Sequence, residues 1–508
     1  MSVSPYSSAA LKRSALHFLT GKAVSGMLTL IILLLLVRVL TVEEYGIYVI
    51  LVAGMELLLA VTSLGLPWTV ARYLPEFRLR ASGKMLAHFV WQAMALISLF
   101  LVIGILLLLW ILPWLLSSME FAQFTDVARL YLLMMLLEGL GRNIQDNALG
   151  PLLQQGWVQI SLVVRNLTLL LLLGIMVTQG MVHLCQVVLA ELAASALGAV
   201  LALCGLVRYL HKNCDLSKRD DWQPPAWSEM WSIARQMYFS HLIALIYSPQ
   251  VFVFFVQRYL GVEAAALFGF LRSLFGQIFR YLPATLLFGL IRPKLVASYV
   301  NTGDMLELTR NANFVGKLSL FVLMPFLIFA WLVGDELLNF LSGDKFNQTG
   351  YYLAVFLLTL IPFSQHQILG AVAMISDKSH LSLWGATLST LVLPLAYWLL
   401  EAGMGLWSFI IAINLSHMIN NAVLVIGLIH STAYRPDSVS FFKLAAAALV
   451  GFILVRQLEI PVNGWLDLLI MAVLASGSFL LTAYFIKPFQ MEERSRLNRL
   501  LNRKIFAW

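Results

Sequence analysis

The sequence predicts an all-α polytopic membrane protein with about 14 transmembrane helices, arranged as two six-helix lobes plus two C-terminal helices. Of its 508 residues, 60% are hydrophobic and only 12% are charged, whereas a soluble protein carries about a quarter charged residues. Long apolar runs such as 27–37 lack the alternation of a barrel strand. Because backbone polar groups must be satisfied inside the hydrocarbon, such runs predict helices.

The order of apolar segments defines the predicted spans. A helix needs about 20 apolar residues to cross about 30 Å of hydrocarbon. By this criterion the predicted spans are 16–38, 46–66, 86–112, 128–149, 157–178, 182–207, 230–256, 264–290, 312–334, 351–373, 380–400, 405–429, 440–458 and 465–486. The predicted organisation is an N-terminal lobe over 1–207, a cytoplasmic linker over 208–229, a C-terminal lobe over 230–430, two additional helices within 440–486 and a basic cytoplasmic tail over 487–508.

The segments between spans carry basic residues mostly on one side. With the N-terminus inside, roughly 21 Lys and Arg residues fall in cytoplasmic segments and about 4 in outside segments. The outside residues are Arg38, Arg258, Lys345 and Arg456. Both termini are therefore expected in the cytoplasm. Lys12 and Arg13 precede a long apolar run with no small-residue cleavage site, which predicts a retained first span.

Two similar stretches indicate an internal repeat. Arg38–Glu43 follows the first predicted span and Arg258–Glu263 follows the seventh, an offset of 220 residues. At the same offset Arg72 aligns with Arg292. Six spans preserve orientation, so the halves would be parallel repeats about an axis along the membrane normal. Transporters built this way place their substrate path between the halves.

The fourth predicted span carries Glu138, Arg142, Gln145 and Asp146 on one face. The two carboxylates lie one turn on either side of the guanidinium. One interpretation is a self-neutralising group that holds this helix to its neighbours. The other is a functional site, because ionisable residues inside spans usually face a cavity or a partner.

The eighth predicted span carries a stripe of polar and small residues through a helix rich in Leu and Phe. The stripe consists of Gly269, Arg272, Ser273, Gly276, Gln277 and Arg280. Small residues alone would favour helix packing. Two arginines without an acid on the same face indicate a path for an anion, because Arg can hold phosphate oxygens in a fork.

Other charges within predicted spans extend these two sets. Lys22, Arg235 and Lys317 lie near cytoplasmic ends, where long side chains can reach the interface, and Glu56 lies near mid-span, as an ion-pair partner or a proton-cycling acid. The predicted substrate-binding residues are Arg142, Arg165, Arg235, Arg272, Gln277, Arg280 and Lys317. The predicted coupling or ion-pair residues are Glu56, Glu138, Asp146 and Glu191. Together these residues carry more positive than negative charges, which favours an anionic substrate.

Several signals that would indicate other chemistry are missing from the sequence. Cys185, Cys204 and Cys214 have no metal-ligand spacing, so no metal is expected. The sequence contains no phosphate-binding loop and none of the usual hydrolase motifs. We therefore expect no cofactor and no enzymatic activity. The net charge of +8 is attributed to orientation in the membrane, not to nucleic acid.

Polar residues elsewhere in the spans have packing as their simplest interpretation. His241 and His366 are isolated histidines that we expect to be hydrogen-bonded packing residues. Asn414, His417 and Asn421 share a face of the twelfth predicted span, where they either line a cavity or bond neighbouring helices.

The first 85 residues resemble a known transporter family. The stretches that carry the resemblance are Arg38-Val39-Leu40-Thr41-Val42-Glu43-Glu44-Tyr45-Gly46-Ile47-Tyr48 and Leu64-Gly65-Leu66-Pro67-Trp68-Thr69-Val70-Ala71-Arg72-Tyr73-Leu74-Pro75-Glu76. They are similar to the polysaccharide transporter family of the multidrug/oligosaccharidyl-lipid/polysaccharide flippase superfamily. Thr41 stands where that family often has Gly, and Ser63 where an acid is common.

The resemblance implies a flippase for undecaprenyl-pyrophosphate-linked oligosaccharide, the repeat unit of an O-antigen, capsule or exopolysaccharide, in the bacterial inner membrane. Its expected partners are this lipid-linked anionic glycan and bilayer lipids, with a polysaccharide polymerase and other assembly proteins as further candidates. Two alternatives stay open. A glycan polymerase or ligase would need a larger outward loop than 113–127 or 335–350. A cation-coupled multidrug exporter is disfavoured by the cationic excess.

Overall fold

The computed structural model describes residues 8–118, 121–180, 182–214, 223–286, 299, 304–376 and 378–501. Across these ranges the regular secondary structure is entirely helical. Thirteen helical segments within them are long and apolar enough to cross a membrane. The prediction of an all-α polytopic membrane protein is therefore confirmed.

One predicted span is absent from those thirteen segments because of its charges. Residues 128–149 form α5 (Thr125–Asn143) followed by a π-helical turn, η2 (Ile144–Leu149). Asp126, Arg129, Glu138 and Arg142 all lie on α5. A helix with this many charges is tolerated in a membrane only where other helices surround those charges.

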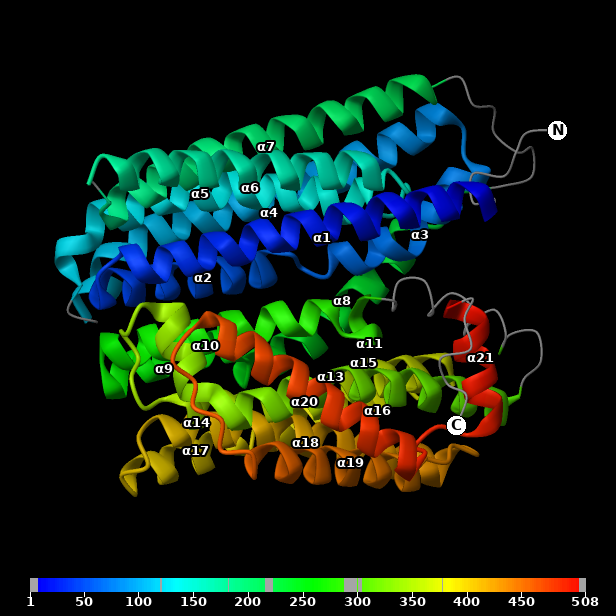
Figure 1. Cartoon of the computed structure of the whole chain (residues 1–508). Coiled ribbons are helices and arrows are strands. Elements are labelled where there is room, and N and C mark those ends of the chain that lie inside the picture. Colours follow the sequence, from blue (N-terminus) through cyan, green and yellow to red (C-terminus); the bar gives the residue numbers. More distant parts are fainter. Residues whose placement is uncertain are drawn as a thin grey trace. The chain divides into compact units, whose positions relative to one another are not determined.

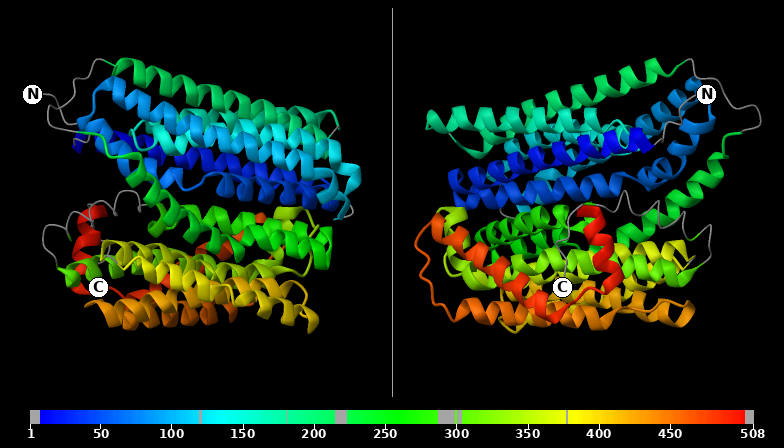
Figure 2. Two further views of the ribbon diagram at one scale, coloured as in Figure 1. Left: turned by 180° about the vertical axis from the view of Figure 1, so that it is seen from behind. Right: turned by 45° about the vertical axis from the view of Figure 1, so that its right-hand side comes forward.

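The chain divides into two units by its internal contacts. The first unit comprises Met1–Leu245 and Val253–Ala266, and the second comprises Ile246–Phe252 and Leu267–Trp508. Besides α5 and η2, the first unit contains α1 (Ser8–Val39), α2 (Val42–Thr62), α3 (Leu66–Arg80), α4 (Gly83–Ser118), η1 (Ala122–Phe124), α6 (Gln155–Thr178), α7 (Leu184–Lys212) and nearly all of α8 (Trp227–Ile246). Its long helices run side by side (Figures 1 and 2), with α6 packed between α1 and α7, and α5 against α7.

The second unit is also a helical bundle. Residues of α9 (Pro249–Leu260) and α10 (Val262–Tyr281) belong to both units. The second unit also contains α11 (Pro283–Leu286), α13 (Met305–Ser342), α14 (Gly350–Leu358), α15 (Leu360–Ile375), α16 (His380–Ser389), α17 (Val392–Glu401), α18 (Leu406–Ser431), α19 (Ser438–Arg456), α20 (Trp465–Ile486) and α21 (Met491–Leu501). Within it, α13 packs against α14, α15, α19 and α20, and α18 packs against α14–α17.

Several predicted segments differ in detail from the helices observed. The span 230–256 is two helices, because Pro249 begins α9 and the Ser248 hydroxyl accepts a hydrogen bond from the Val251 amide (3.4 Å). The span 264–290 stops at Tyr281 in α10, and residues 287–290 lie outside the described ranges. The basic segment after the second span contains α3, and the basic tail contains α21.

The helix α3 forms because its apolar residues recur on one face. Val70, Tyr73 and Phe77 are buried, whereas Arg72 and Arg80 are exposed. Gly65 precedes the helix with φ +77°, and a Cβ there would lie 2.1 Å from the Ala234 carbonyl oxygen. The glycine of this stretch therefore permits both the turn and a close approach to α8.

The stretch Arg38–Tyr48 connects the first two helices through a helix cap. The Thr41 hydroxyl accepts a hydrogen bond from the Glu44 amide, and the Glu44 carboxylate accepts one from the Thr41 amide, each 3.1 Å. The second oxygen of Glu44 accepts a hydrogen bond from the Leu184 amide at the start of α7 (3.1 Å). The similar stretch Arg258–Glu263 also lies at a junction between helices, α9 and α10.

Candidate functional site

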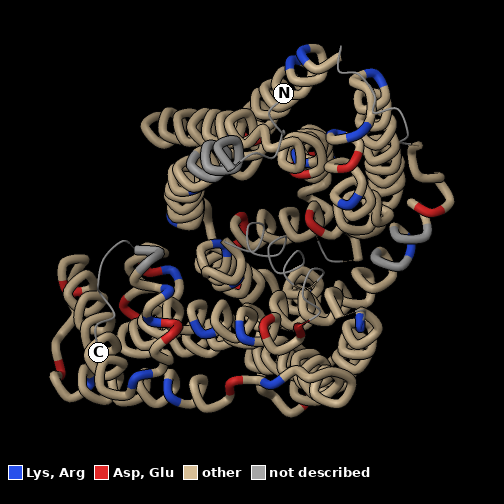
Figure 3. Tube along the Cα trace, turned by 90° about the vertical axis from the view of Figure 1, so that its right-hand side faces the viewer, with Lys and Arg blue, Asp and Glu red and all other residues tan. Residues whose placement is uncertain are grey.

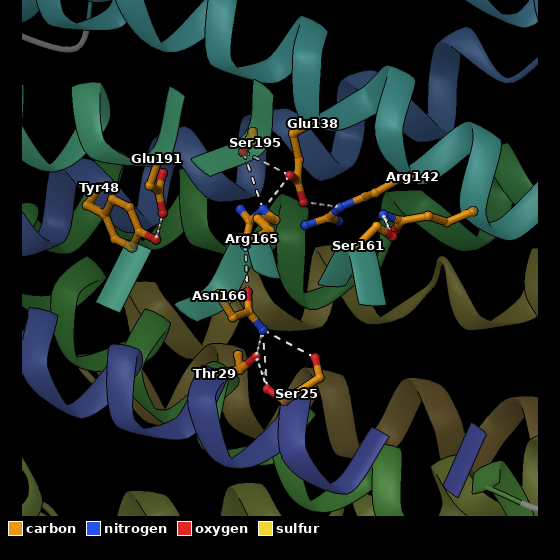
Figure 4. A network of polar contacts seen from close by, with 11 residues as sticks. Ser25, Thr29, Tyr48, Glu138, Arg142, Ser161, Arg165, Asn166, Glu191 and Ser195 are labelled. Carbon is orange, nitrogen blue, oxygen red and sulfur yellow. Dashed lines mark hydrogen bonds and ion pairs between the residues drawn. The ribbon is translucent and has the colours of Figure 1, made fainter. Parts of the chain in front are cut away.

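Polar side chains from five helices meet inside the first unit (Figure 4). The helices are α1, α2, α5, α6 and α7, which pack against one another. Charged residues are sparse along the rest of the chain (Figure 3). A polar group inside a helical bundle needs hydrogen-bond partners, because burying it without them costs free energy. The partners of each group therefore indicate its role.

Glu138 on α5 binds two guanidinium groups. Its Oε1 accepts a hydrogen bond from Arg142 Nε (2.8 Å), and its Oε2 accepts one from Arg165 Nε on α6 (2.7 Å). The Ser195 hydroxyl on α7 donates a third hydrogen bond to Oε2 (3.0 Å). Glu138 is 6% exposed, so this carboxylate is buried but fully partnered. It joins α5, α6 and α7.

Arg165 extends the network to α1 through its neighbour in the chain. Its Nη1 donates to the Asn166 side-chain oxygen (3.0 Å). The Asn166 amide nitrogen then donates to the Ser25 hydroxyl (3.2 Å) and the Thr29 hydroxyl (3.0 Å) on α1. The Arg165 side chain is only 16% exposed. Arg165 therefore has a clear structural function, and its predicted part in substrate binding stays a prediction.

Arg142 is the more exposed of the two arginines. Its side chain is 40% exposed, and its terminal guanidinium nitrogens have no hydrogen-bond partner among the residues that the structure describes. Glu56, which is half-buried, and Asp146, which is exposed on η2, both act electrostatically on Arg142. The pairing with Glu138 was predicted, whereas Asp146 forms no ion pair within the described chain. Gln145 of η2 donates instead to the Ser161 hydroxyl on α6 (2.9 Å).

Glu191 on α7 lies in the same bundle with different partners. The Tyr48 hydroxyl on α2 donates a hydrogen bond to its Oε1 (2.7 Å). Its Oε2 is buried and has no partner among the described residues, and the same is true of the Tyr131 hydroxyl on α5. Glu191 therefore differs from Glu138, although both are buried carboxyl groups between the same helices.

The polar stripe of α10 borders buried apolar residues of the same helix. Leu271, Leu274 and Phe275 are buried, and Phe275 packs against Phe356 and Phe363 of the second unit. Of the predicted stripe residues, Arg272 and Gln277 are half-buried and Arg280 is exposed. These three polar residues are therefore more exposed than the apolar residues beside them.

The other two predicted cations lie in different surroundings. Arg235 on α8 is exposed. Lys317 on α13 is 1% exposed and forms ion pairs with Asp437 (2.8 Å) and with Glu493 of α21. Asp437 also caps α19 by accepting a hydrogen bond from the Ser440 amide (3.2 Å). Lys317 therefore joins three helices of the second unit, and its role in substrate binding remains a prediction.

Asparagines of α18 bond to neighbouring helices. Asn414 donates to the Val355 carbonyl of α14 (3.3 Å), and Asn421 donates to the Pro362 carbonyl of α15 (2.6 Å). These contacts favour the helix-bonding interpretation of the two residues. Both ring nitrogens of His417 are buried without a partner in the described part of the chain.

Sequence reasoning did not single out several members of the network. These are Ser25, Thr29, Tyr48, Asn166 and Ser195. A signal existed for Asn166, which lies beside Arg165 inside an apolar span, because polar residues within spans commonly bond other helices. Among the described residues no group of three or more His, Cys, Asp or Glu side chains could hold a metal ion.

Comparison with known proteins gives both a family and a fold. The family model described as polysaccharide biosynthesis protein matches residues 11–306. A search of curated proteins found no match.

Three solved structures illustrate the fold. The chain is similar to the lipid II flippase MurJ in an inward closed conformation, with 12% identity, TM-score 0.70, and coverage of 96% of this chain and 99% of that chain. It is similar to a multidrug resistance MATE family transporter of the MOP superfamily, inward-facing, with 14% identity, TM-score 0.60 and coverage of 82% and 98%. A MOP superfamily transporter from Pyrococcus furiosus gives 15% identity, TM-score 0.51 and coverage of 83% and 95%.

Proposed function

Because the chain belongs to the polysaccharide biosynthesis protein family, we propose that it is a flippase that moves an undecaprenyl-pyrophosphate-linked oligosaccharide across the bacterial inner membrane by alternating access. The oligosaccharide is the repeat unit of an O-antigen, capsule or exopolysaccharide. It travels from the cytoplasmic to the periplasmic leaflet. Both termini of the protein lie in the cytoplasm.

The position of Arg272 carries this proposal. Arg272 lies near the middle of α10, a helix that is long and apolar enough to cross a membrane. A guanidinium at that depth is costly in lipid. Arg272 is half-buried, whereas Leu271, Leu274 and Phe275 of the same helix are buried. A water-filled path used by an anionic group would stabilise the guanidinium.

The chemistry of the stripe fits a pyrophosphate. Arg272 and Arg280 are two turns apart on one face, and Gln277 lies between them with an amide that can donate hydrogen bonds to phosphate or sugar oxygens. In the first unit, Arg142, whose side chain is 40% exposed, and the exposed Arg235 are the other predicted cations that are accessible. The lipid tail stays in the bilayer while the charged head group crosses.

The fold supports a transporter over an enzyme. Proteins with a similar fold include a lipid II flippase and a MATE family transporter. Moving a lipid-linked head group needs a path and two access states but no bond cleavage. Bilayer lipids are therefore the second partner, and a polysaccharide polymerase would receive the product.

A deletion strain complemented with variants tests the proposal. Deletion should leave lipid-linked repeat units facing the cytoplasm and abolish the surface polymer. Arg272→Ala and Arg280→Ala should each reduce export about tenfold or more, because hydrogen bonds to charged groups contribute about 1.5–3 kcal/mol each. Arg258→Ala is the matched control, since Arg258 is an exposed arginine in the last turn of the preceding helix. All variants should reach the membrane at wild-type levels.

Two results would contradict the proposal. Unchanged surface polymer and unchanged intermediates in the deletion strain, with no second flippase present, would remove the function. Normal export by the Arg272→Ala/Arg280→Ala double variant would remove the stripe from the mechanism. Resistance to cationic dyes on overexpression would instead indicate a multidrug exporter, and elongation of a lipid-linked donor by the purified protein would indicate a polymerase.

A further inference from the structure

Two buried carboxyl groups in the first unit have very different partners. Glu138 accepts hydrogen bonds from two arginines and from Ser195. Glu191 is 4% exposed and accepts one hydrogen bond, from a neutral tyrosine. Its second oxygen is buried without a partner in the described chain. An ionised carboxylate with one unpaired oxygen in such a place is costly.

The charged and titratable groups around Glu191 come from the helices packed against α7. Tyr48 lies on α2, Tyr131 and Glu138 on α5, and Arg165 on α6. Of these, Tyr48 is the one that bonds Glu191. Arg142 on α5 also acts on it electrostatically, and Asp146 on η2 is exposed.

Arg165 does not neutralise Glu191 by direct contact. Its Nε bonds Glu138 and Ser195, and its Nη1 bonds Asn166. Within the described residues no lysine or arginine nitrogen lies within ion-pair distance of Glu191. The buried Tyr131 hydroxyl, also without a partner, acts on Glu191 electrostatically. Glu191, Tyr48 and Tyr131 thus form a small buried polar cluster, and no described cation is in ion-pair contact with its carboxyl group.

We propose that Glu191 holds a proton on Oε2 and is the group that exchanges a proton with water during the transport cycle. Tyr48 donates to Oε1, which is then the carbonyl oxygen of a carboxylic acid. When water reaches Oε2, hydronium donates a proton that converts the carboxylate to the acid and leaves water. At another point of the cycle the acid returns this proton to water, which forms hydronium again. Each exchange changes the local charge beside Arg165 by one unit.

This inference names a coupling ion for the proposed flippase, and only the transport experiment below rests on that function. Infrared spectroscopy of the full-length protein in lipid tests the proton site directly. Near neutral pH the wild type should show a carbonyl band of a protonated carboxylic acid that shifts in deuterated water. Glu191→Gln should lose this band. Asp126→Asn, which changes an exposed acid of α5, is the matched control and should keep it.

Two spectroscopic results would overturn the assignment. One is a wild-type protein without the band, and the other is a band that persists in folded Glu191→Gln. Tyr48→Phe gives an independent measurement in which Glu191 is unchanged. Loss of the hydroxyl should move the band to higher frequency, because the carbonyl loses a hydrogen bond. A band at the wild-type frequency in Tyr48→Phe would also contradict the assignment.

Transport measurements then connect the proton to the cycle. Proteoliposomes containing an undecaprenyl-pyrophosphate-linked oligosaccharide should show translocation by the wild type that changes severalfold when a pH gradient is imposed. Glu191→Gln should translocate at one rate with or without the gradient, and Asp126→Asn should respond as the wild type does. A wild-type response in Glu191→Gln would overturn the coupling role. Absence of translocation by every protein, with the infrared band present, would contradict the flippase and leave the proton site standing.

Discussion

The arginines of the α5–α7 network and those of the α10 stripe occupy membrane helices in contrasting ways. Arg165 is 16% exposed, and its hydrogen bonds join α5, α6 and α7. Arg272 is half-buried and Arg280 is exposed on α10. In the first case the neighbouring helices supply the partners that a guanidinium needs. In the second the arginines keep partial or full exposure beside buried apolar residues of the same helix.

The comparison shows that local spacing distinguishes the two kinds of arginine only in part. Arg142 has an acid four positions earlier, Glu138, and the pair forms as the spacing predicts. No acid lies within one turn of Arg272 or Arg280 in the sequence. Arg165 also lacks a nearby acid, yet it pairs with Glu138, 27 residues away. A missing local acid therefore does not by itself identify a binding arginine.

Removal of the Glu138 carboxylate gives the largest expected effect on stability. Glu138→Ala leaves Arg142 and Arg165 close together without their shared anion. Removing one partner of a buried ion pair costs about 3–5 kcal/mol. The thermal unfolding temperature in one detergent should fall strongly relative to the wild type.

An exposed ion pair provides the control for Glu138→Ala. Arg129 and Asp126 form a pair at 3.2 Å on the same helix, with both side chains largely exposed. Asp126→Ala should change stability by less than about 1 kcal/mol. Equal effects of the two variants would mean that the α5–α7 network does not hold the bundle together.

The acid-dependent stability of the second unit is the next largest effect. Burial alone would raise the pKa of Asp437, but hydrogen bonds from the Lys317 ammonium and from Ser440 outweigh it and hold that pKa below its usual value. The stabilisation is therefore present above the unfolded pKa of about 3.9 and is lost as the pH falls through the folded value. It is smaller than the effect of Glu138→Ala, because Lys317 keeps Glu493 as a partner.

The unfolding temperatures of the wild type and of Asp437→Asn measure the stabilisation that the ionised Asp437 carboxylate provides. Their difference should be constant near neutral pH and shrink as the pH drops below about 4. Glu459→Gln is the control, since Glu459 lies in the exposed turn after α19 and forms no ion pair with the described residues. If the difference between the two unfolding temperatures grew as the pH fell, the predicted direction of the pH dependence would be wrong.

The membrane fold was predictable because hydropathy acts over whole spans. Runs such as 27–37 exclude water-exposed alternatives whatever their neighbours are. The interruptions of spans and the helices between them were less predictable. Pro249 divides one predicted span into two helices. The segment between the second and third predicted spans forms α3, with Tyr73 and Phe77 buried on one face. In both cases one or two residues determine the local structure, and the mean hydropathy of a 20-residue window does not register them.

The candidate site was predictable only where its partners are close in sequence. Glu138 and Arg142 are four residues apart, so their pairing followed from helix geometry. Tyr48 and Glu191 are 143 residues apart, and no periodicity brings them together. The position of Lys317 near a cytoplasmic span end predicts a side chain that reaches the membrane–water interface. In the structure Lys317 is buried and forms ion pairs with Asp437 and Glu493. Such contacts depend on how helices pack, which sequence spacing does not encode.

The smallest expected effect on stability is that of removing Arg272. Arg272→Ala should change stability by less than about 1 kcal/mol, because the Arg272 side chain is only half-buried and the buried Leu271, Leu274 and Phe275 are left unchanged. Arg165→Ala, which removes the bonds to Glu138 and Asn166, is the matched comparison and should lower the unfolding temperature clearly. Arg272→Ala should instead lose export at normal stability. If it unfolds as readily as Arg165→Ala, then Arg272 belongs to the packing of its bundle, and the difference between the two sets of arginines disappears.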